Sequence, residues 1–295
     1  MQKVVIGMTL VSLLFSCSVS PSGTTPQEPG TEPKGEKTDT LKILAIGNSF
    51  SSDAVDDNLY DLFKAAGIPV VIGNLNATGS SLEDHWKRIS EQKADYTFIR
   101  TKRGGRTSTE ACEIGAILSS DSWNIVSIQQ ASSKSADKDS YLPYAKQLKE
   151  FIESKTSAKV AFHQTWAYEN SAFENEPDNS QQQMYENIVA AVNAAVKEAD
   201  IKIVIPTGTA VQNARTTYLE TSLNRDYLHL SMTTGRYLAS CVWFETLSGK
   251  EVTGNSYHPE SITPATAEIC QKAAHYACLT PDSVTPMPQY QYQPE

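Results

Sequence analysis

Leu41-Lys42-Ile43-Leu44-Ala45-Ile46-Gly47-Asn48-Ser49-Phe50-Ser51 is an apolar run that ends in a glycine and a cluster of small polar residues. Such a run is typical of a buried strand in a parallel sheet. Ligands collect at the carboxyl ends of the strands in these sheets, and Ser49 lies just past this end, ahead of a predicted helix. Its hydroxyl is therefore expected beside backbone N–H groups and the positive end of a helix dipole, which suit an oxyanion. The alternative is that Gly-Asn-Ser serves only as a turn and helix cap.

A second stretch, Arg225-Asp226-Tyr227-Leu228-His229, comes much later in the chain. Its spacing of three places Asp226 and His229 on one side of a single turn. The aspartate could then accept a hydrogen bond from one imidazole nitrogen and leave the other free to take a proton from Ser49. The two stretches together supply a nucleophile, a base and an orienting acid in the order Ser…Asp…His. Taken alone, Asp-x-x-His is more often part of an exposed loop.

Apolar runs alternate with helical patterns from Leu41 onward, which predicts a single α/β domain with a five-stranded parallel sheet between two layers of helices. This is a three-layer α/β/α sandwich. The expected strands are Lys42–Ile46, Pro69–Leu75, Ile125–Gln129, Lys159–His163 and Lys202–Pro206. The expected helices are Asp53–Ala66, Ser81–Glu91, Thr109–Leu118, Tyr141–Glu153, Gln181–Ala199, Thr233–Thr246 and Pro264–Ala277. A small surface hairpin is expected from Tyr96–Arg100 and the residues up to Gly105.

Candidate donors to an oxyanion follow two other strands. Gly79 comes just after the second strand, where a backbone N–H without a side chain can approach an oxygen closely. Gln129 and Gln130 end the third strand, and a side-chain amide there could donate to the same oxygen. The choice between the two glutamines stays open, with Gln130 favoured. A turn glycine and two structural amides are the alternative.

The N-terminus carries the signature of export. Lys3 precedes an apolar run from Val4 to Phe15 that is too short to span a membrane. Leu14-Phe15-Ser16-Cys17 resembles a bacterial lipobox, in which cleavage leaves a lipidated Cys17. An ordinary secretory signal is the alternative. We therefore predict a lipoprotein signal peptide over residues 1–16, and a lipidated cysteine with a disordered linker rich in Pro, Gly, Ser, Thr and Glu over residues 17–40.

Composition excludes some classes of function. The chain of 295 residues is 40% hydrophobic and 20% charged, which suits a globular protein with a sizeable core. Its net charge of −9 argues against nucleic acid and against electrostatic docking on anionic lipid. Cys112 and Cys241 are conceivable disulfide partners in an exported protein, although buried free thiols are the simpler expectation. No Cys-x-x-Cys or His-Glu-x-x-His spacing points to a metal site, and we expect no cofactor.

The chain resembles the SGNH (GDSL-like) hydrolase superfamily and, within it, the bacterial DUF4886 domain family. The matching segments are Ile46–Ser51, Gly79–Trp86, Val126–Ser132, His163–Tyr168 and Arg225–Tyr237. They run in the order of the superfamily over nearly the whole domain, which we place at residues 41–280, with an irregular C-terminal tail at 281–295. The resemblance implies a flavodoxin-like α/β/α fold, with Ser49 as nucleophile, His229 as general base and Asp226 as its partner. It also implies an oxyanion hole made by the N–H groups of Ser49 and Gly79.

Two positions depart from the family pattern. Asn48 replaces the Asp of the usual Gly-Asp-Ser, and Gln129-Gln130 stands where the superfamily normally has Gly-x-Asn-Asp. The replaced Asp is not the acid of the triad, so the departure at Asn48 threatens catalysis little.

The expected function is a serine ester hydrolase that removes acetyl or other small acyl groups from a carbohydrate. Trp166 and Tyr168 would suit stacking on a sugar, although core packing is an equal alternative, and His85 and His163 are expected to be structural. The partners expected are a small or glycan ester and a membrane reached only through the lipid at Cys17. The protein is expected to be a monomer of the cell envelope. A glycan-binding lipoprotein without catalysis and a metal-dependent hydrolase are the alternatives.

Overall fold

Strand β1 (Leu41–Gly47) lies at the centre of the sheet. The computed structural model, which describes residues 40–175 and 179–292, pairs β1 in parallel with β2 (Val70–Asn76) and with β5 (Ile125–Ile128). The parallel arrangement continues through β6 (Lys159–His163) to β7 (Ile203–Ile205). The five predicted parallel strands are therefore confirmed. Most of their ends differ from the predicted positions by one residue, and the others agree.

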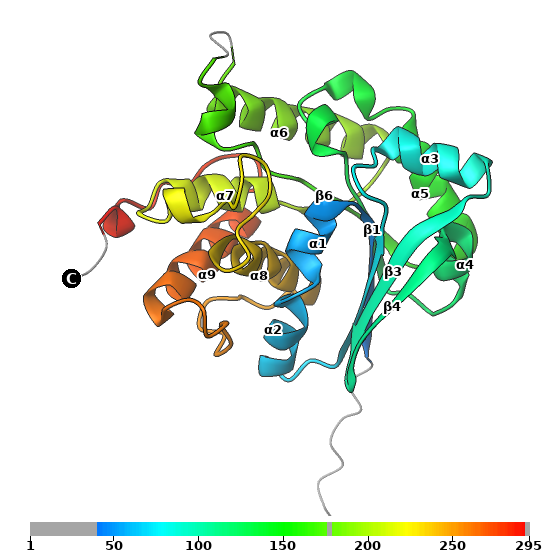
Figure 1. Cartoon of the computed structure of the whole chain (residues 1–295), viewed down its shortest axis with the longest axis horizontal. Coiled ribbons are helices and arrows are strands. Elements are labelled where there is room, and N and C mark those ends of the chain that lie inside the picture. Colours follow the sequence, from blue (N-terminus) through cyan, green and yellow to red (C-terminus); the bar gives the residue numbers. More distant parts are fainter. Residues whose placement is uncertain (1–39, 176–178, 293–295) are drawn as a thin grey trace, which may run out of the picture. The chain divides into compact units, whose positions relative to one another are not determined.

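The sheet has seven strands rather than five, because the predicted hairpin joins its edge. Strands β3 (Ala94–Lys102) and β4 (Gly105–Glu113) form an antiparallel hairpin (Figure 1). The order across the sheet is β4-β3-β2-β1-β5-β6-β7. Gly104 and Gly105 turn the hairpin with φ angles of 100° and 130°, which glycine adopts most readily. The expected helix at Thr109–Leu118 is wrong in its first half, because Thr109 pairs with Phe98 of β3. Only α4 (Ile114–Ser119) is helical there.

Helices cover both faces of the sheet because alternate strand residues point to opposite sides. Ile43 and Ala45 of β1 belong to one buried cluster, and Leu44 and Ile46 belong to the other. The first face carries α1 (Ser49–Val55), α2 (Leu59–Ala65), α7 (Thr207–Arg215), α8 (Thr234–Ser248) and α9 (Pro264–Leu279). The second carries α3 (Leu82–Ser90), α4, α5 (Tyr144–Lys155) and α6 (Gln181–Glu198).

A second helical prediction needs correction, and one helix was not expected. The expected helix Asp53–Ala66 is two helices, because Asp56, Asp57 and Asn58 interrupt it with side chains that make tertiary contacts instead of favouring the helix. The first of them also begins earlier, at Ser49. Helix α7 was not predicted. All nine of its residues are buried although five of them are polar, and the tertiary hydrogen bonds that permit this burial are not visible in the sequence.

The ends of the chain complete the description. The predicted signal peptide, Cys17 and all of the linker but residue 40 lie outside the described residues, and they stay predictions. After α9 the chain packs back onto α7, where Met287 is fully buried and its N–H donates to Thr216 Oγ1. Within residues 40–175 and 179–292, no helix is both long and apolar enough to cross a membrane. Cys112 and Cys241 are buried free thiols.

Candidate active site

Ser49 is the first residue of α1, directly after the carboxyl end of β1. Asn48 caps the helix, because its side-chain oxygen accepts a hydrogen bond of 2.9 Å from the Phe50 N–H. A Cβ at Gly47 would lie only 2.7 Å from Ser51 Oγ, so this tight turn needs a glycine. The turn brings Ser49 to the surface while its neighbours Asn48 and Phe50 stay buried.

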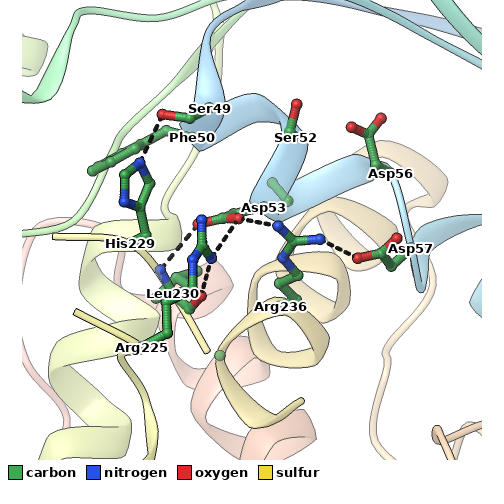
Figure 2. Close-up of polar contacts among 12 residues, drawn as sticks. Ser49, Phe50, Ser52, Asp53, Asp56, Asp57, Arg225, His229, Leu230 and Arg236 are labelled. Carbon is green, nitrogen blue, oxygen red and sulfur yellow. Dashed lines mark hydrogen bonds and ion pairs between the residues drawn. The ribbon is translucent and has the colours of Figure 1, made fainter. Parts of the chain in front are cut away.

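The structure brings His229 to Ser49 across 180 positions of sequence. His229 Nε2 lies 3.0 Å from Ser49 Oγ, as Figure 2 shows, and His229 Nδ1 lies 2.9 Å from Asp226 Oδ2. The ring therefore has a carboxylate on one nitrogen and a hydroxyl on the other. Since a carboxylate only accepts hydrogen bonds, Nδ1 carries the proton in the neutral ring and Nε2 accepts from the serine.

Asp226 is held as an ionised acceptor by its own loop. Its Oδ1 accepts hydrogen bonds from the backbone N–H groups of Leu228 at 2.9 Å and His229 at 2.6 Å. Partial burial alone would raise the pKa of Asp226, but the hydrogen bonds from His229 and Leu228 outweigh burial and lower this pKa below its ordinary value. The carboxylate is thus charged at neutral pH and orients the imidazole.

Aromatic packing supports the imidazole from the side. Phe50 stacks on Trp166 with ring centroids 4.1 Å apart, and Phe50 and His229 pack edge to face with ring centroids 5.8 Å apart. Trp166 is fully buried and donates from its indole N–H to the Leu228 carbonyl at 2.8 Å. Of the two uses considered for Trp166, core packing is the one that the structure shows.

A buried chain of hydrogen bonds lies beneath the site, across the carboxyl ends of four strands. Gln129 Nε2 donates to Asn48 Oδ1 at 2.9 Å, and Gln129 Oε1 is 2.9 Å from His163 Nδ1. His163 Nε2 is 3.0 Å from Thr207 Oγ1. Because Gln129 Oε1 can only accept, His163 is protonated on Nδ1 and accepts at Nε2 from the threonine. Burial lowers the pKa of His163 to about 3, so this histidine is neutral and structural.

The expectation that Gln130 lends its amide to an oxyanion is wrong. Both of its donor hydrogens are used by Ser140, whose carbonyl and hydroxyl lie 2.9 and 3.0 Å from Gln130 Nε2. Its oxygen accepts from the N–H groups of Leu82 and Ala131. Gln130 therefore fixes the start of α3, and Gln129 is engaged in the buried chain below the site. Gln130 has no donor left for an oxyanion, and Gln129 is buried and donates to Asn48.

Backbone N–H groups remain as the candidate oxyanion donors. Gly79 is exposed and has a φ of +68°, and Thr78 beside it lines the same cavity as Ser49. Asn48 Nδ2 donates to the Ser80 carbonyl at 2.9 Å and so pins the Gly79 loop to the start of α1. An aspartate at position 48 could not donate this hydrogen bond, which explains structurally why this chain has an asparagine there. No described residue accepts a hydrogen bond from the N–H of Ser49 or of Gly79.

The cavity beside Ser49 measures about 270 Å³, and its exposed lining is about half polar and half apolar. Its lining comprises Ser49, Ser52, Asp53, Asn76, Thr78, Thr97, Ile99, Arg225 and Arg236. Eight of these nine residues have polar side chains, and Ile99 is the single apolar one. The small volume and the hydrogen-bonding groups suit a compact substrate better than a long alkyl chain.

The other histidine considered, His85, is buried on α3 with its Nδ1 2.7 Å from the Tyr96 hydroxyl. Burial and then the nearby charge of Arg88 lower its pKa to about 3. No three His, Cys, Asp or Glu side chains among residues 40–175 and 179–292 come together as a metal site would require.

Comparison with known proteins adds a family and a fold. The model of a domain of unknown function, DUF4886, matches residues 42–277. The chain is 42% identical to a DUF4886 family protein from Bacteroides uniformis, with a TM-score of 0.82 over 85% of this chain and 100% of that one. A candidate SGNH hydrolase from Slackia heliotrinireducens is 18% identical, with a TM-score of 0.50 over 70% of this chain and 98% of that one. The second likeness shows the SGNH hydrolase fold alone. No curated protein matches the chain.

The buried chain under the site predicts a dependence of stability on pH. The His163 pKa of about 3 lies below the unfolded value of 6.5, so only the unfolded chain binds a proton to this ring between these limits. Stability is therefore lost as the pH falls from 6.5 toward 3. Between pH 7.5 and 5.5, His163 should lower the free energy of unfolding by about 1.4 kcal/mol.

Urea unfolding of the wild type and of His163→Asn at both pH values measures this contribution. The asparagine keeps a donor toward Gln129 but does not titrate. Between pH 7.5 and 5.5, the free energy of unfolding of His163→Asn should therefore fall by about 1.4 kcal/mol less than that of the wild type. An identical pH dependence in both proteins would contradict a neutral, buried His163.

Proposed function

Because the chain belongs to the DUF4886 family and has the SGNH hydrolase fold, we propose that it is a serine esterase with Ser49, His229 and Asp226 as its triad. The observation that carries the proposal is the hydrogen-bond relay from Asp226 through His229 to Ser49, with separations of 2.9 and 3.0 Å. These are distances at which proton transfer between the groups needs no rearrangement.

The reaction is an acyl transfer in two stages. Ser49 Oγ attacks the ester carbonyl while His229 Nε2 takes its proton, and Asp226 stabilises the resulting imidazolium. The N–H groups of Ser49 and Gly79 would stabilise the oxyanion. When the tetrahedral intermediate collapses, His229 gives the proton to the departing alcohol oxygen and the C–O bond breaks. A water molecule, deprotonated by His229, then attacks the acyl-enzyme and releases the acid and free Ser49.

A carbohydrate that bears acetyl or other small acyl groups is the substrate class that the surroundings favour. The cavity beside Ser49 is small and offers hydroxyl, amide and guanidinium groups along its walls. Tyr227, inside the Asp226–His229 turn, is 52% exposed and meets the edge of the Tyr168 ring at 5.9 Å. An exposed aromatic ring held next to the base is a surface on which a sugar ring can stack. Tyr227 lies inside the Asp-x-x-His motif, but the motif alone does not predict a function for it.

Replacement of Ser49 tests the reaction class. Ser49→Ala should reduce kcat for p-nitrophenyl acetate by on the order of 10³-fold or more, because the nucleophile is lost. Asp226→Asn should reduce kcat by on the order of 10²-fold or more, because the imidazole loses its orienting charge. Release of p-nitrophenolate measures both.

Ser154→Ala is the matched control, because this exposed serine lies on α5, on the opposite face of the sheet, and should leave kcat unchanged. Full activity in Ser49→Ala would contradict the triad. Binding of oligosaccharides by a wild type that turns over no ester would instead support the non-catalytic alternative.

Replacement of Tyr227 tests the carbohydrate. Loss of a stacked ring is worth about 0.5–1.5 kcal/mol, so Tyr227→Ala should raise KM for an acetylated monosaccharide roughly threefold to tenfold. The backbone contact of Tyr227, whose carbonyl accepts from the Glu169 N–H at 2.8 Å, survives this change. Ethyl acetate has no ring to stack, so its KM should stay the same. An equal rise in KM for both esters would argue against sugar stacking on Tyr227.

A further inference from the structure

Asp53 lies one turn after Ser49 on α1, and its carboxylate is completely buried. Three groups surround it, as Figure 2 shows. Arg225 Nη1 lies 2.9 and 3.1 Å from its two oxygens, Arg236 Nη2 lies 2.7 Å from Oδ1, and the Leu230 N–H donates to Oδ2 at 3.0 Å. A buried charge with this many partners is well compensated, and each partner is fixed in return.

Two of these partners are the ends of the segment that carries the base. Arg225 directly precedes Asp226, and Leu230 directly follows His229. Arg225 closes the turn itself, because its N–H donates to the His229 carbonyl at 3.1 Å and its guanidinium donates to the Leu230 carbonyl. Asp53 therefore binds the segment at both of its ends, and His229 projects from between them.

We propose that Asp53 is a positioning residue for the esterase reaction, setting the separation between the Ser49 hydroxyl and the His229 imidazole. The inference rests on the proposed function. Ser49 and Asp53 occupy positions i and i+4 of one short helix, so a segment bound to Asp53 is placed directly relative to Ser49. Asp53 borders the cavity beside Ser49, but its side chain has no exposed surface. Both of its oxygens are engaged by the two arginines and the Leu230 N–H, so its effect passes through the segment.

Ser49 and His229 come from separate parts of the chain, so the distance between them depends on how the segment is held against α1. A change in this distance alters the rate of the chemical step. A misplacement of about 1 Å between reacting groups can lower a rate roughly 10²-fold. On its other side the segment is held by the Trp166 indole, which donates to the Leu228 carbonyl at 2.8 Å. Without Asp53 that contact remains, so the segment should stay folded but lose its fixed distance from α1.

Asp57 offers a matched control. It carries the same charge near the same arginine, since it pairs with Arg236 Nη1, but it contacts neither Arg225 nor Leu230. It is partly exposed and forms a second, longer pair of 3.5 Å with Arg106. Asp57→Asn removes a carboxylate from the neighbourhood and leaves the binding of the segment intact.

The experiment compares Asp53→Asn, Asp57→Asn and the wild type on p-nitrophenyl acetate, at a temperature where circular dichroism shows each protein folded. Asp53→Asn should lower kcat roughly tenfold to a hundredfold with KM changed less than about threefold. Asp57→Asn should keep kcat within about twofold of the wild type. A purely structural role would lower the melting temperature and leave kcat of the folded enzyme unchanged.

Arg225→Gln is the second variant, in case Asp53→Asn does not fold. Arg225 is partly exposed, and Arg236 and the Leu230 N–H still compensate Asp53 after its removal, so this protein should fold and lose kcat about tenfold. Wild-type kcat in a folded Asp53→Asn, or an equal loss in Asp57→Asn, would overturn the inference.

A crystal structure of Asp53→Asn, or of Arg225→Gln if that variant alone folds, separates this inference from the proposed function. The separation between Ser49 Oγ and His229 Nε2 should lengthen beyond about 3.5 Å, whether or not the wild type turns over any ester. An unchanged separation would contradict the positioning role. Inactivity of the wild type toward every ester would contradict only the proposed function.

Discussion

The hydrogen bond between Ser49 Oγ and His229 Nε2 depends on how one short segment late in the chain is docked against α1. The segment carries Asp226 and His229, which lie at the surface, and ends at Leu230, which is buried in the core. Polar contacts add to this apolar anchor: the Asp53 carboxylate binds the two ends of the segment, and the Trp166 indole binds the Leu228 carbonyl. Polar contacts of this kind have defined directions, so they fix a distance more sharply than apolar packing does.

Directed polar contacts also order the residues below the site. Asn48, Gln129, His163 and Thr207 join the carboxyl ends of β1, β5, β6 and the start of α7 in a single line of buried hydrogen bonds. Each of these groups would be costly to bury without its partner. Loss of any one of them would therefore leave an unpaired buried group and destabilise the fold. The sheet edge is thereby rigid directly under Ser49. Two departures from the family pattern, Asn48 and Gln129, are both members of this line and support each other.

Much of this architecture could be predicted from the sequence, for reasons that particular residues make clear. Strand β1 and the two candidate catalytic stretches could be predicted because apolar runs, a turn and Asp-x-x-His are local patterns. Helix α7 was missed because all of its residues are buried, and β4 was assigned in part to a helix because its pairing with β3 is a tertiary contact. The expectation that Gln130 donates to an oxyanion is wrong for a similar reason. Its partner Ser140 lies in a loop whose path no local pattern reveals.

Asp53 shows where sequence reasoning stopped. A carboxylate four residues after a candidate nucleophile and an arginine beside the candidate acid were both visible, but only the folded chain joins them. The signal that could have found Asp53 is its spacing from Ser49, which places both on one side of the same helical turn. The structure thus joins to the proposed triad a residue, Asp53, that the motif does not contain.

The most direct test of the central claim, that Ser49 is a nucleophile activated by His229, is covalent labelling. The wild type and His229→Ala are treated with a fluorophosphonate, digested, and examined by peptide mass spectrometry. The account predicts a phosphonyl adduct on Ser49 of the wild type, formed at least about a hundredfold faster than in His229→Ala because the base is lost. An adduct at another serine with Ser49 unmodified, or equal rates in the two proteins, would contradict it.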